Sequence, residues 1–287
     1  MKYILSVSDL TNKEVNEIFK LAKKFEKNPY SNCLKNKNFV LLFEKPSTRT
    51  RLSFEVGINH LGGNVIYLDP LTTQLSRGET LEDTARILEK YVDCIIARVY
   101  KHETLEILSE NAKVPMVNAL SDIEHPCQAL TDLYTIKQRK KKLKKLKITF
   151  LGDGTNNTFN SLIYLCERFG LEVVVSSPKE FRPKIKGKYR VIEDPTIAVR
   201  NSDILYIDTF VSMGEKNHHR IEDLKKYQLN SRLLKLAKKN AIVMHPLMAH
   251  REVEITSDVM DGKQSVIFEQ AENRLHVQKA ILYLLMK

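Results

Sequence analysis

The sequence has no long apolar run and no close pair of cysteines. No stretch approaches the ~18 apolar residues of a membrane-spanning helix, and the apolar start reaches Asp9 too soon for a signal peptide. The 4 cysteines show no C-x-x-C pair and no metal-ligand spacing; they are Cys33, Cys94, Cys127 and Cys166. These absences argue against a disulfide scaffold and a cysteine-bound metal, and they predict a soluble cytoplasmic protein without a membrane partner.

Tryptophan is also absent, and positive charge is in excess. The 287 residues carry 46 lysines and arginines against 35 acidic residues, a formal net charge of +11. A basic surface attracts polyanions without specific contacts, which raises the question of a nucleic-acid partner. Much of the excess lies in the run "KQRKKKLKKLK" at residues 137–147, where no aromatic side chain can stack on a base. A solvated helix or linker explains this run better, and we expect no nucleic-acid partner.

Strand-like and helix-like segments alternate along the chain. The 43% hydrophobic and 28% charged content is that of a globular protein, and 287 residues suit two domains of about 100 to 150 residues each. Most predicted strands are followed by a segment with helical periodicity. We therefore predict an α/β fold with two doubly wound parallel-sheet domains. The apolar runs place strands at 38–44, 64–69, 93–100, 115–120, 147–153, 172–178, 203–208 and 241–246.

The stretch "FEKPSTRTRLSFE", residues 43–55, includes the end of the first of these strands. In parallel sheets ligands bind beyond the carboxyl ends of the strands, and a helix that starts there points free N–H groups at an anion. Ser47, Thr48 and Thr50 would add hydroxyl donors, and Arg49 could hold two phosphate oxygens in its planar fork. The glycines and lysine of a P-loop are missing, so a small phosphate ester or anhydride fits better than a nucleoside triphosphate. The alternative is a capping hydroxyl beside solvated arginines.

Other strand ends also carry polar side chains. Arg98 closes an apolar strand, where a guanidinium is costly to bury unless it meets an anion. His125 and Gln128, in "SDIEHPCQALTD", lie between a strand and a helix. An imidazole there could donate to an oxygen that becomes negative in a transition state, or it could merely cap the helix. In the second half Asp208 ends a strand, where it could meet an ammonium group or act as an ordinary strand cap.

These motifs, in this order, resemble the aspartate and ornithine carbamoyltransferase family. The resemblance runs from "FEKPSTRTRLSFE" through "QLSRGETLEDTARIL", "HPCQALTDL", "GDGTNNTFNSL" and "DTFVSMGE" to "SVIFEQAENRLHVQKA". It implies two α/β domains with the active site in the cleft between them, a homotrimer or a multiple of trimers, and neither a metal nor an organic cofactor. A carbamoyl phosphate-binding domain would comprise residues 1–133 and the returning C-terminal helix 271–287, and an amino acid-binding domain residues 134–270.

The resemblance also implies roles for individual residues. Arg98, His125 and Thr50 would be catalytic, because they would stabilise the oxyanion formed when a neutral amine attacks the carbonyl carbon. Gln74 would reach the site of a neighbouring subunit. Carbamoyl phosphate would be bound by Ser47, Thr48, Arg49, Thr50, Gln74, Arg98, His125, Gln128 and Arg274. L-Ornithine would be bound by Asn157, Asp208, Ser212, Met213 and Leu247.

One segment departs from the pattern of the ornithine enzymes. Where these usually carry His-Cys-Leu-Pro, this chain has His245-Pro246-Leu247-Met248, so the thiol near the reacting amine is missing. This departure leaves open a carbamoyltransferase for another amine, such as putrescine, lysine, an acylated ornithine or aspartate. The high positive charge leaves a third hypothesis, a non-catalytic or nucleic-acid-binding relative. The Asn-Asn of "GDGTNNT" and the segment "DTFVSMGE" favour ornithine.

Overall fold

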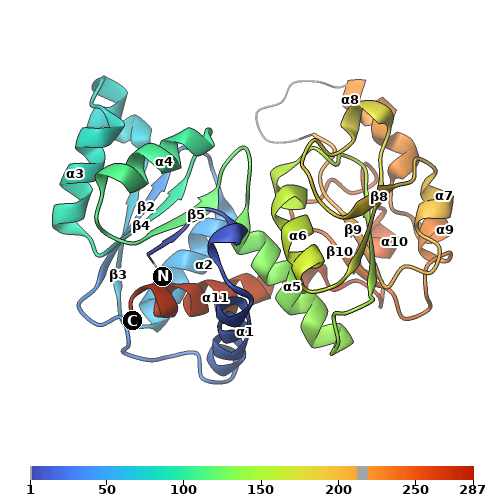
Figure 1. Cartoon of the computed structure of the whole chain (residues 1–287), viewed down its shortest axis with the longest axis horizontal. Coiled ribbons are helices and arrows are strands. Elements are labelled where there is room, and N and C mark those ends of the chain that lie inside the picture. Colours follow the sequence, from blue (N-terminus) through green and yellow to red (C-terminus); the bar gives the residue numbers. More distant parts are fainter. Residues whose placement is uncertain (1, 212–218) are drawn as a thin grey trace. The chain divides into compact units, whose positions relative to one another are not determined.

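The computed structural model describes residues 2–211 and 219–287 (Figure 1). The chain divides into two compact units, unit 1 with residues 1–131 and 273–287, and unit 2 with residues 132–272. Each unit is built on a parallel sheet, which confirms the predicted α/β fold with two parallel-sheet domains. Among the described residues, no helix is long and apolar enough to cross a membrane.

The described part of unit 1 holds a 5-stranded sheet in the order β1-β5-β4-β2-β3, with every pairing parallel. Its strands are β1 (Tyr3–Ile4), β2 (Asn38–Phe43), β3 (Asn64–Leu68), β4 (Cys94–Arg98) and β5 (Met116–Leu120). Strands β2 and β4 are buried over nearly their full length, as their unbroken apolar runs predict. Of these strands only β1 was not predicted, because its two residues are too few to show a strand pattern of apolar residues.

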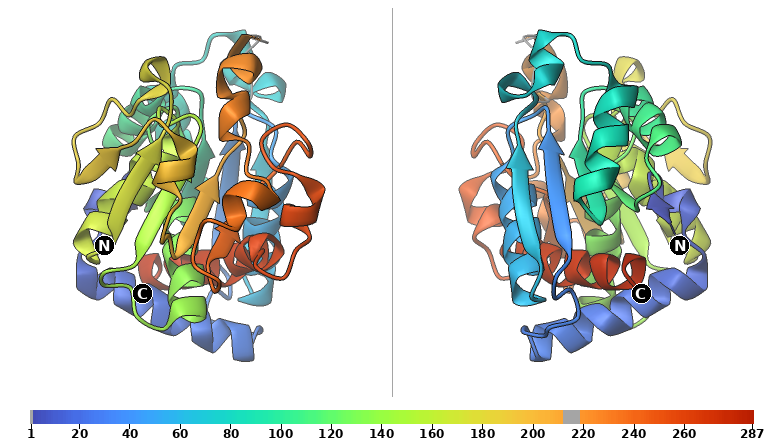
Figure 2. Two further views of the ribbon diagram at one scale, coloured as in Figure 1. Left: turned by 90° about the vertical axis from the view of Figure 1, so that its right-hand side faces the viewer. Right: turned by 90° about the vertical axis from the view of Figure 1, so that its left-hand side faces the viewer.

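Helices cover both faces of this sheet. Apolar side chains of α3 (Leu81–Tyr91) and α4 (His102–Asn111) share a core with those of β2 and β4 on one face. Away from these two helices, α1 (Asn12–Lys27), α2 (Thr48–His60) and α11 (Ile267–Leu285) pack together, and α1 and α11 lie side by side in both views of Figure 2. The short 3-10 turns are η1 (Val7–Asp9), η2 (Pro70–Thr72) and η3 (Gln74–Arg77).

Unit 2 repeats this plan over its described residues. Its 5-stranded parallel sheet has the order β10-β9-β6-β7-β8. The strands are β6 (Lys147–Leu151), β7 (Glu172–Ser176), β8 (Tyr189–Val191), β9 (Ile204–Ile207) and β10 (Ile242–Met244). The helices and turns are α6 (Asn157–Arg168), α7 (Pro195–Ala198), α8 (His219–Leu224), α9 (Ser231–Leu234), α10 (Ser257–Met260), η4 (Lys179–Phe181) and η5 (Lys225–Tyr227).

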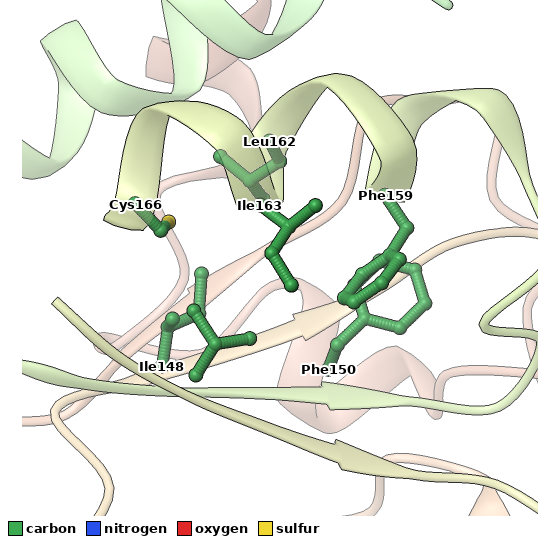
Figure 3. Close-up of a pocket in the computed structure, with 7 residues that line it drawn as sticks. Ile148, Phe150, Phe159, Leu162, Ile163 and Cys166 are labelled. Carbon is green, nitrogen blue, oxygen red and sulfur yellow. The ribbon is translucent and has the colours of Figure 1, made fainter. Parts of the chain in front are cut away.

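A small pocket lies between α6 and the strands beneath it (Figure 3). Its walls come from Ile148, Phe150, Phe159, Leu162, Ile163, Cys166 and Val173. The rings of Phe150 and Phe159 meet edge to face, with centroids 4.9 Å apart. All seven side chains are apolar or a buried thiol, so the pocket is part of the core of unit 2 and offers a polar ligand no partner.

Both sheets have a topological switch point, which decides where ligands can bind. From β2 the chain passes through α2 to β3 on one side, and then returns across the sheet to β4 on the other side. The same happens at β6, which lies between β7 and β9. The loops after two such neighbouring strands diverge and leave a crevice at the carboxyl edge of the sheet. The loops after β2 and β4, and those after β6 and β9, are therefore the places for functional side chains.

Two helices belong to both units. The division between residues 131 and 132 falls within α5 (Pro126–Lys140), and that between 272 and 273 falls within α11. The lysine run 137–147 begins on the last turn of α5 and continues through a mostly exposed turn to β6. Leu143 is the buried exception, at 8% exposure. The run is thus a helix end and a solvated connection, as predicted.

Candidate active-site residues in the two units

The loop after β2 leads directly into α2. Ser47 occupies the N-cap position with an extended backbone, φ −160° and ψ 111°, but its side chain makes no capping hydrogen bond. By contrast, Thr11 and Glu14 cap α1 with a reciprocal pair of side-chain bonds. The first turn of α2 holds no acidic residue. Its amide groups and the positive end of its dipole are therefore suited to an external anion, because the Ser47 side chain does not occupy them.

Arg98 ends β4 beside this loop, where its residue pairs with Phe43 in the sheet and its carbonyl accepts a hydrogen bond from the Glu44 amide at 2.8 Å. The residue is 8% exposed. Its Nε has no hydrogen-bond partner in the described part of the chain. Burial, and then the charges of Arg274 and Arg49, lower the pKa of Arg98 to about 10. A buried guanidinium beside two others is unfavourable in the empty protein, which is the electrostatic signature of an anion site.

Arg274 joins three helices at this point. From α11 its Nη1 donates to Oε1 of Gln128 on α5 at 2.5 Å, and its Nη2 donates to Oγ1 of Thr50 on α2 at 3.0 Å. All three side chains are buried, with exposures of 3%, 1% and 2%. Arg274 thereby fixes the side chains of Thr50 and Gln128 relative to its own guanidinium.

His125 follows β5 and immediately precedes α5. Its carbonyl accepts hydrogen bonds from the amides of Gln128 at 3.0 Å and Ala129 at 3.1 Å, so its backbone takes part in the first turn of α5. The side chain is buried. Burial, and then the charges of Arg274 and Arg98, hold the pKa of His125 well below its usual range. The imidazole is therefore neutral at working pH and can act as a hydrogen-bond donor through one nitrogen.

Most of the unit 1 residues that the sequence predicts lie close to one another. Hydrogen bonds link Thr50, Gln128 and Arg274, and the charges of Arg274 and Arg98 act on His125. The charge of Arg49 acts on Arg98, while Ser47 and Thr48 stand at the start of α2. Gln74 is the exception, because it lies exposed on η3 and takes no part in these contacts.

Lys45 is a residue of this region that the sequence did not single out. It stands between the end of β2 and Ser47, and its Nζ lies 4.8 Å from the centroid of the Tyr100 ring. Burial, and then the charge of Arg98, lower the pKa of Lys45. It therefore adds a further cation near Arg98. Lys45 follows a parallel strand directly, and this position could have marked it as a candidate site residue.

In unit 2 the loops after β6 and β9 meet at Asp208. Nδ2 of Asn156 donates to Oδ2 of Asp208 at 3.3 Å, and the Thr209 amide donates to Oδ1 at 2.8 Å. Asn156 also caps α6, since its Oδ1 accepts a hydrogen bond from the Phe159 amide at 2.8 Å. Burial raises the pKa of Asp208. The predicted Asn157 is the first residue of α6 and is half-buried. Its neighbour Asn156, which makes the contact to Asp208, was not predicted.

The loop after β10 contains a buried pair, His245 and Glu254, both 0% exposed. Nδ1 of His245 accepts a hydrogen bond from the Leu247 amide at 2.9 Å, so the ring proton lies on Nε2, 3.3 Å from Oε1 of Glu254. Glu254 also accepts from the amide of His250 at 2.5 Å. Leu247 is half-buried at φ 60°, and its peptide bond to Met248 is cis. The predicted Ser212 and Met213 lie outside the described residues.

Comparison with known proteins places both units in one family. Residues 2–138 match the model described as "Aspartate/ornithine carbamoyltransferase, carbamoyl-P binding domain", and residues 144–285 match "Aspartate/ornithine carbamoyltransferase, Asp/Orn binding domain". The ornithine carbamoyltransferase of Methanococcus aeolicus is 44% identical, covering 97% of both chains. That of Archaeoglobus fulgidus is 43% identical, covering 98% of this chain and 96% of the relative.

Solved structures give the same result. The ornithine carbamoyltransferase from Pyrococcus furiosus is 42% identical with a TM-score of 0.94, covering 99% of this chain and 97% of the other. The one from Thermus thermophilus is 40% identical, also with a TM-score of 0.94, covering 100% and 99%. The likeness thus extends over nearly the full length of each pair.

Proposed function

Because the chain belongs to the aspartate/ornithine carbamoyltransferase family, we propose that it transfers the carbamoyl group of carbamoyl phosphate to the side-chain amine of L-ornithine. The products are L-citrulline and phosphate. The observation that carries the proposal is Arg98, a buried arginine that lies beside two other arginines and has an Nε without a partner in the described chain. Such a group requires an anion to offset its cost of burial.

Unit 1 would bind carbamoyl phosphate. The phosphate would lie at the start of α2, where the amides of the first turn, the hydroxyls of Ser47, Thr48 and Thr50, and the fork of Arg49 supply donors. The carbamoyl end would contact Arg98, His125, Gln128 and Arg274. The hydrogen bonds from Arg274 to Thr50 and Gln128 support this assignment. A side chain that a buried neighbour already holds in place loses little conformational entropy when substrate binds. Gln74 would act on a neighbouring subunit's site.

The reaction would proceed by attack of a neutral amine on the carbonyl carbon. The oxygen that becomes negative would meet Arg98, Thr50 and the neutral imidazole of His125, a preorganised set of donors worth several kcal/mol in such sites. The attacking nitrogen must lose one proton, which the departing phosphate can accept. As the tetrahedral intermediate collapses, the bond to the phosphate oxygen breaks and the protonated phosphate leaves toward α2. These residues supply the required charge themselves, so the transfer needs neither a metal nor an organic cofactor.

Unit 2 would bind L-ornithine. Asp208 would meet an ammonium group of the substrate, and Asn157, Leu247, Ser212 and Met213 complete the assignment, the last two lying outside the described residues. Asn156 supports the role of Asp208, because its amide donates to one carboxylate oxygen and so helps to orient the carboxylate at the end of β9. An ammonium beside Asp208 would stabilise the charged carboxylate that burial disfavours.

A substrate panel tests the function directly. The chain is assayed with labelled carbamoyl phosphate and ornithine, putrescine, lysine, acetylornithine or aspartate, and we expect citrulline from ornithine as the main product. The panel matters because Pro246 and Met248 replace the usual Cys and Pro of this loop. A kcat/KM higher for putrescine or lysine than for ornithine would overturn the assignment of the amine.

The roles of the two units are tested by substitution. Asp208→Asn keeps the shape of the side chain and should raise the KM for ornithine by about 100-fold, as expected when one partner of a charge pair is lost. The KM for carbamoyl phosphate should change little. Arg49→Ala should give the opposite pattern. Equal effects of Asp208→Asn on both KM values would contradict the division of the substrates between the units.

The proposal also sets the pH dependence. The amine must be neutral to attack, and an alkyl ammonium titrates near pH ~10, so kcat/KM for ornithine should rise about tenfold per pH unit below that value. The pKa of His125 is held too low for this residue to contribute a break in the neutral range. A second break near pH 6 to 7 that disappears in His125→Gln would show that the imidazole titrates, contrary to this expectation.

We further infer a homotrimer, or a multiple of trimers, that acts in the cytoplasm in arginine biosynthesis or in arginine and ornithine catabolism. Exposed apolar side chains support self-association of unit 1: Leu52 and Val56 on α2 and Ile66 on the edge strand β3 have exposures of 52%, 37% and 46%. Sedimentation equilibrium should give three times the 33.2 kDa mass of the chain, or a multiple of that trimer mass. A monomer at micromolar concentration would argue against the assembly.

A further inference from the structure

The N-terminal segment Tyr3–Asp9 has no role in the proposed site, yet it is fixed to the loop that carries His125. Strand β1 pairs in parallel with β5, Tyr3 with Met116 and Ile4 with Val117. Beyond β1 the chain turns into η1, where Ser6 and Asp9 form a reciprocal capping box. The segment is therefore held by its pairing with β5 and by its own capping box, apart from any contact with the loop after β5.

The contact to that loop is made by Glu124, the residue directly before His125. Its carboxylate accepts a hydrogen bond from Oγ of Ser6 at 2.5 Å and from the amide of Val7 at 3.2 Å. Glu124 is 6% exposed. A buried carboxylate costs free energy unless donors are placed for it, and here both of these donors come from a segment about 117 residues earlier in the chain.

The backbone of Glu124 is held as well. Its amide donates to Oγ of Ser121 at 3.2 Å, and its carbonyl accepts from the Ser121 amide at 2.9 Å. Asn118 reinforces the link, because its Nδ2 donates to the carbonyl of Leu5 at 2.8 Å and lies 3.5 Å from the carbonyl of Glu124. The N-terminal segment and the backbone next to His125 thus share one hydrogen-bonded cluster.

We propose that the N-terminal segment, through the Ser6–Glu124 hydrogen bond, positions the imidazole of His125 for carbamoyl transfer. The inference rests on the proposed function, in which His125 donates to the developing oxyanion. One peptide bond joins Glu124 to His125, so a shift of the Glu124 side chain is passed to the His125 backbone. A donor displaced by 1 Å can lose about 100-fold in rate, so Ser6 and Glu124 are positioning residues without touching substrate.

Ser6→Ala and Glu124→Gln test the proposal. Ser6→Ala removes one hydroxyl and leaves the buried carboxylate in place, so it perturbs the fold least. We expect kcat to fall about tenfold or more in both variants, while the KM values for carbamoyl phosphate and ornithine stay within about threefold. Ser6→Thr, which keeps the hydroxyl, should retain most of the activity. Ser8→Ala is the matched control, because Ser8 lies exposed on the same turn and contacts Ser6 only through its backbone amide.

A double-mutant cycle with His125→Ala separates positioning from a general loss of structure. If Ser6 acts through His125, adding Ser6→Ala to His125→Ala should leave kcat unchanged. A further tenfold loss in that background, or wild-type kcat in Ser6→Ala alone, would overturn the positioning role. Failure of the proposed function looks different: the wild-type chain would form no citrulline, or His125→Ala alone would keep full activity, and the inference would fall with it.

Discussion

Arg274 donates to Gln128 through Nη1 at 2.5 Å, which links a helix from the end of the chain to the helix that follows His125. The same guanidinium reaches Thr50 through Nη2 at 3.0 Å. A planar fork can hold both acceptors at once, whereas an ammonium group is a single point charge on a flexible stem. The position therefore requires more than a positive charge, which leads to the first prediction.

Arg274→Lys should raise the KM for carbamoyl phosphate by roughly 10- to 100-fold, because lysine cannot hold Thr50 and Gln128 together, an effect of the size of one or two charge-assisted hydrogen bonds. The KM for ornithine should change little. Steady-state kinetics with each substrate varied in turn measure both values. An unchanged KM for carbamoyl phosphate would mean that the bidentate contact does not shape the site.

Arg98→Met should make the empty protein more stable and inactive. Removing a buried guanidinium beside two other arginines should raise the free energy of unfolding by about 1 to 3 kcal/mol in phosphate-free buffer. Phosphate should then stabilise the wild type by ~2.7 kcal/mol at 100 times Kd, and the variant by less at the same phosphate concentration, because Arg49 and the start of α2 remain. Urea unfolding with and without phosphate measures both effects. Arg86→Met, on the exposed Arg86–Asp83 pair of α3, is the control and should change neither.

Lys279 gives a prediction about pH and stability. It is 0% exposed, and its Nζ donates to the carbonyl of Pro29 at 2.9 Å. Burial lowers the pKa of Lys279 from 10.5 to about 8. Between these two values the unfolded chain binds a proton that the folded protein does not, so this group makes stability rise with pH in that window. The rise should be on the order of 3 kcal/mol and should be absent in Lys279→Met.

The measurement for Lys279 is the difference in unfolding free energy between wild type and variant at pH 8 and pH 10.5. The difference is needed because burial raises the pKa values of Cys94, Cys127 and Cys166, which makes stability fall at high pH in both proteins. Those contributions cancel when the two proteins are compared. A difference that stays constant across the window would contradict the lowered pKa of Lys279.

Tyr206→Phe should cost about 1 to 3 kcal/mol of stability. The Tyr206 hydroxyl donates to the buried carboxylate of Asp132 at 2.8 Å, and Gln270 donates to the same carboxylate at 2.7 Å. Phenylalanine preserves the stacking on Phe150 but removes one donor to a buried charge. Tyr189→Phe is the control, since its half-buried hydroxyl donates to a neutral carbonyl and should matter less. Equal losses in the two variants would show that the charge at Asp132 is irrelevant.

The strands that are buried on both faces could be predicted from the sequence, because burial requires apolar residues along their whole length. Strands such as β2 and β4 are buried on both faces, so their apolar runs are unbroken and easily recognised. Strands β1 and β8 were missed because they contain two and three residues, and β8 lies at a sheet edge where solvent replaces one neighbour. Short edge strands have no room for a period.

The candidate site was predictable to the level of the loop but not of the atom. Parallel strands end at one edge of a sheet, which is why Arg98 and His125 could be expected near the start of α2. Side-chain rotamers at helix starts decide two details of the site. One is the contact of Asn156 with Asp208, and the other is the missing capping bond from the Ser47 side chain. These rotamers depend on the packing around each side chain, and that packing cannot be inferred from a single sequence.

The return of α11 to unit 1 bears on how the protein is made. Unit 2 comprises one continuous stretch, residues 132–272, whereas unit 1 needs residues 273–287 as well. On the ribosome, unit 2 can thus complete its sheet while unit 1 still lacks the helix that carries Arg274 and Lys279. The apolar face that α11 covers stays exposed until residues 273–287 have emerged, so their removal should damage unit 1 more than unit 2.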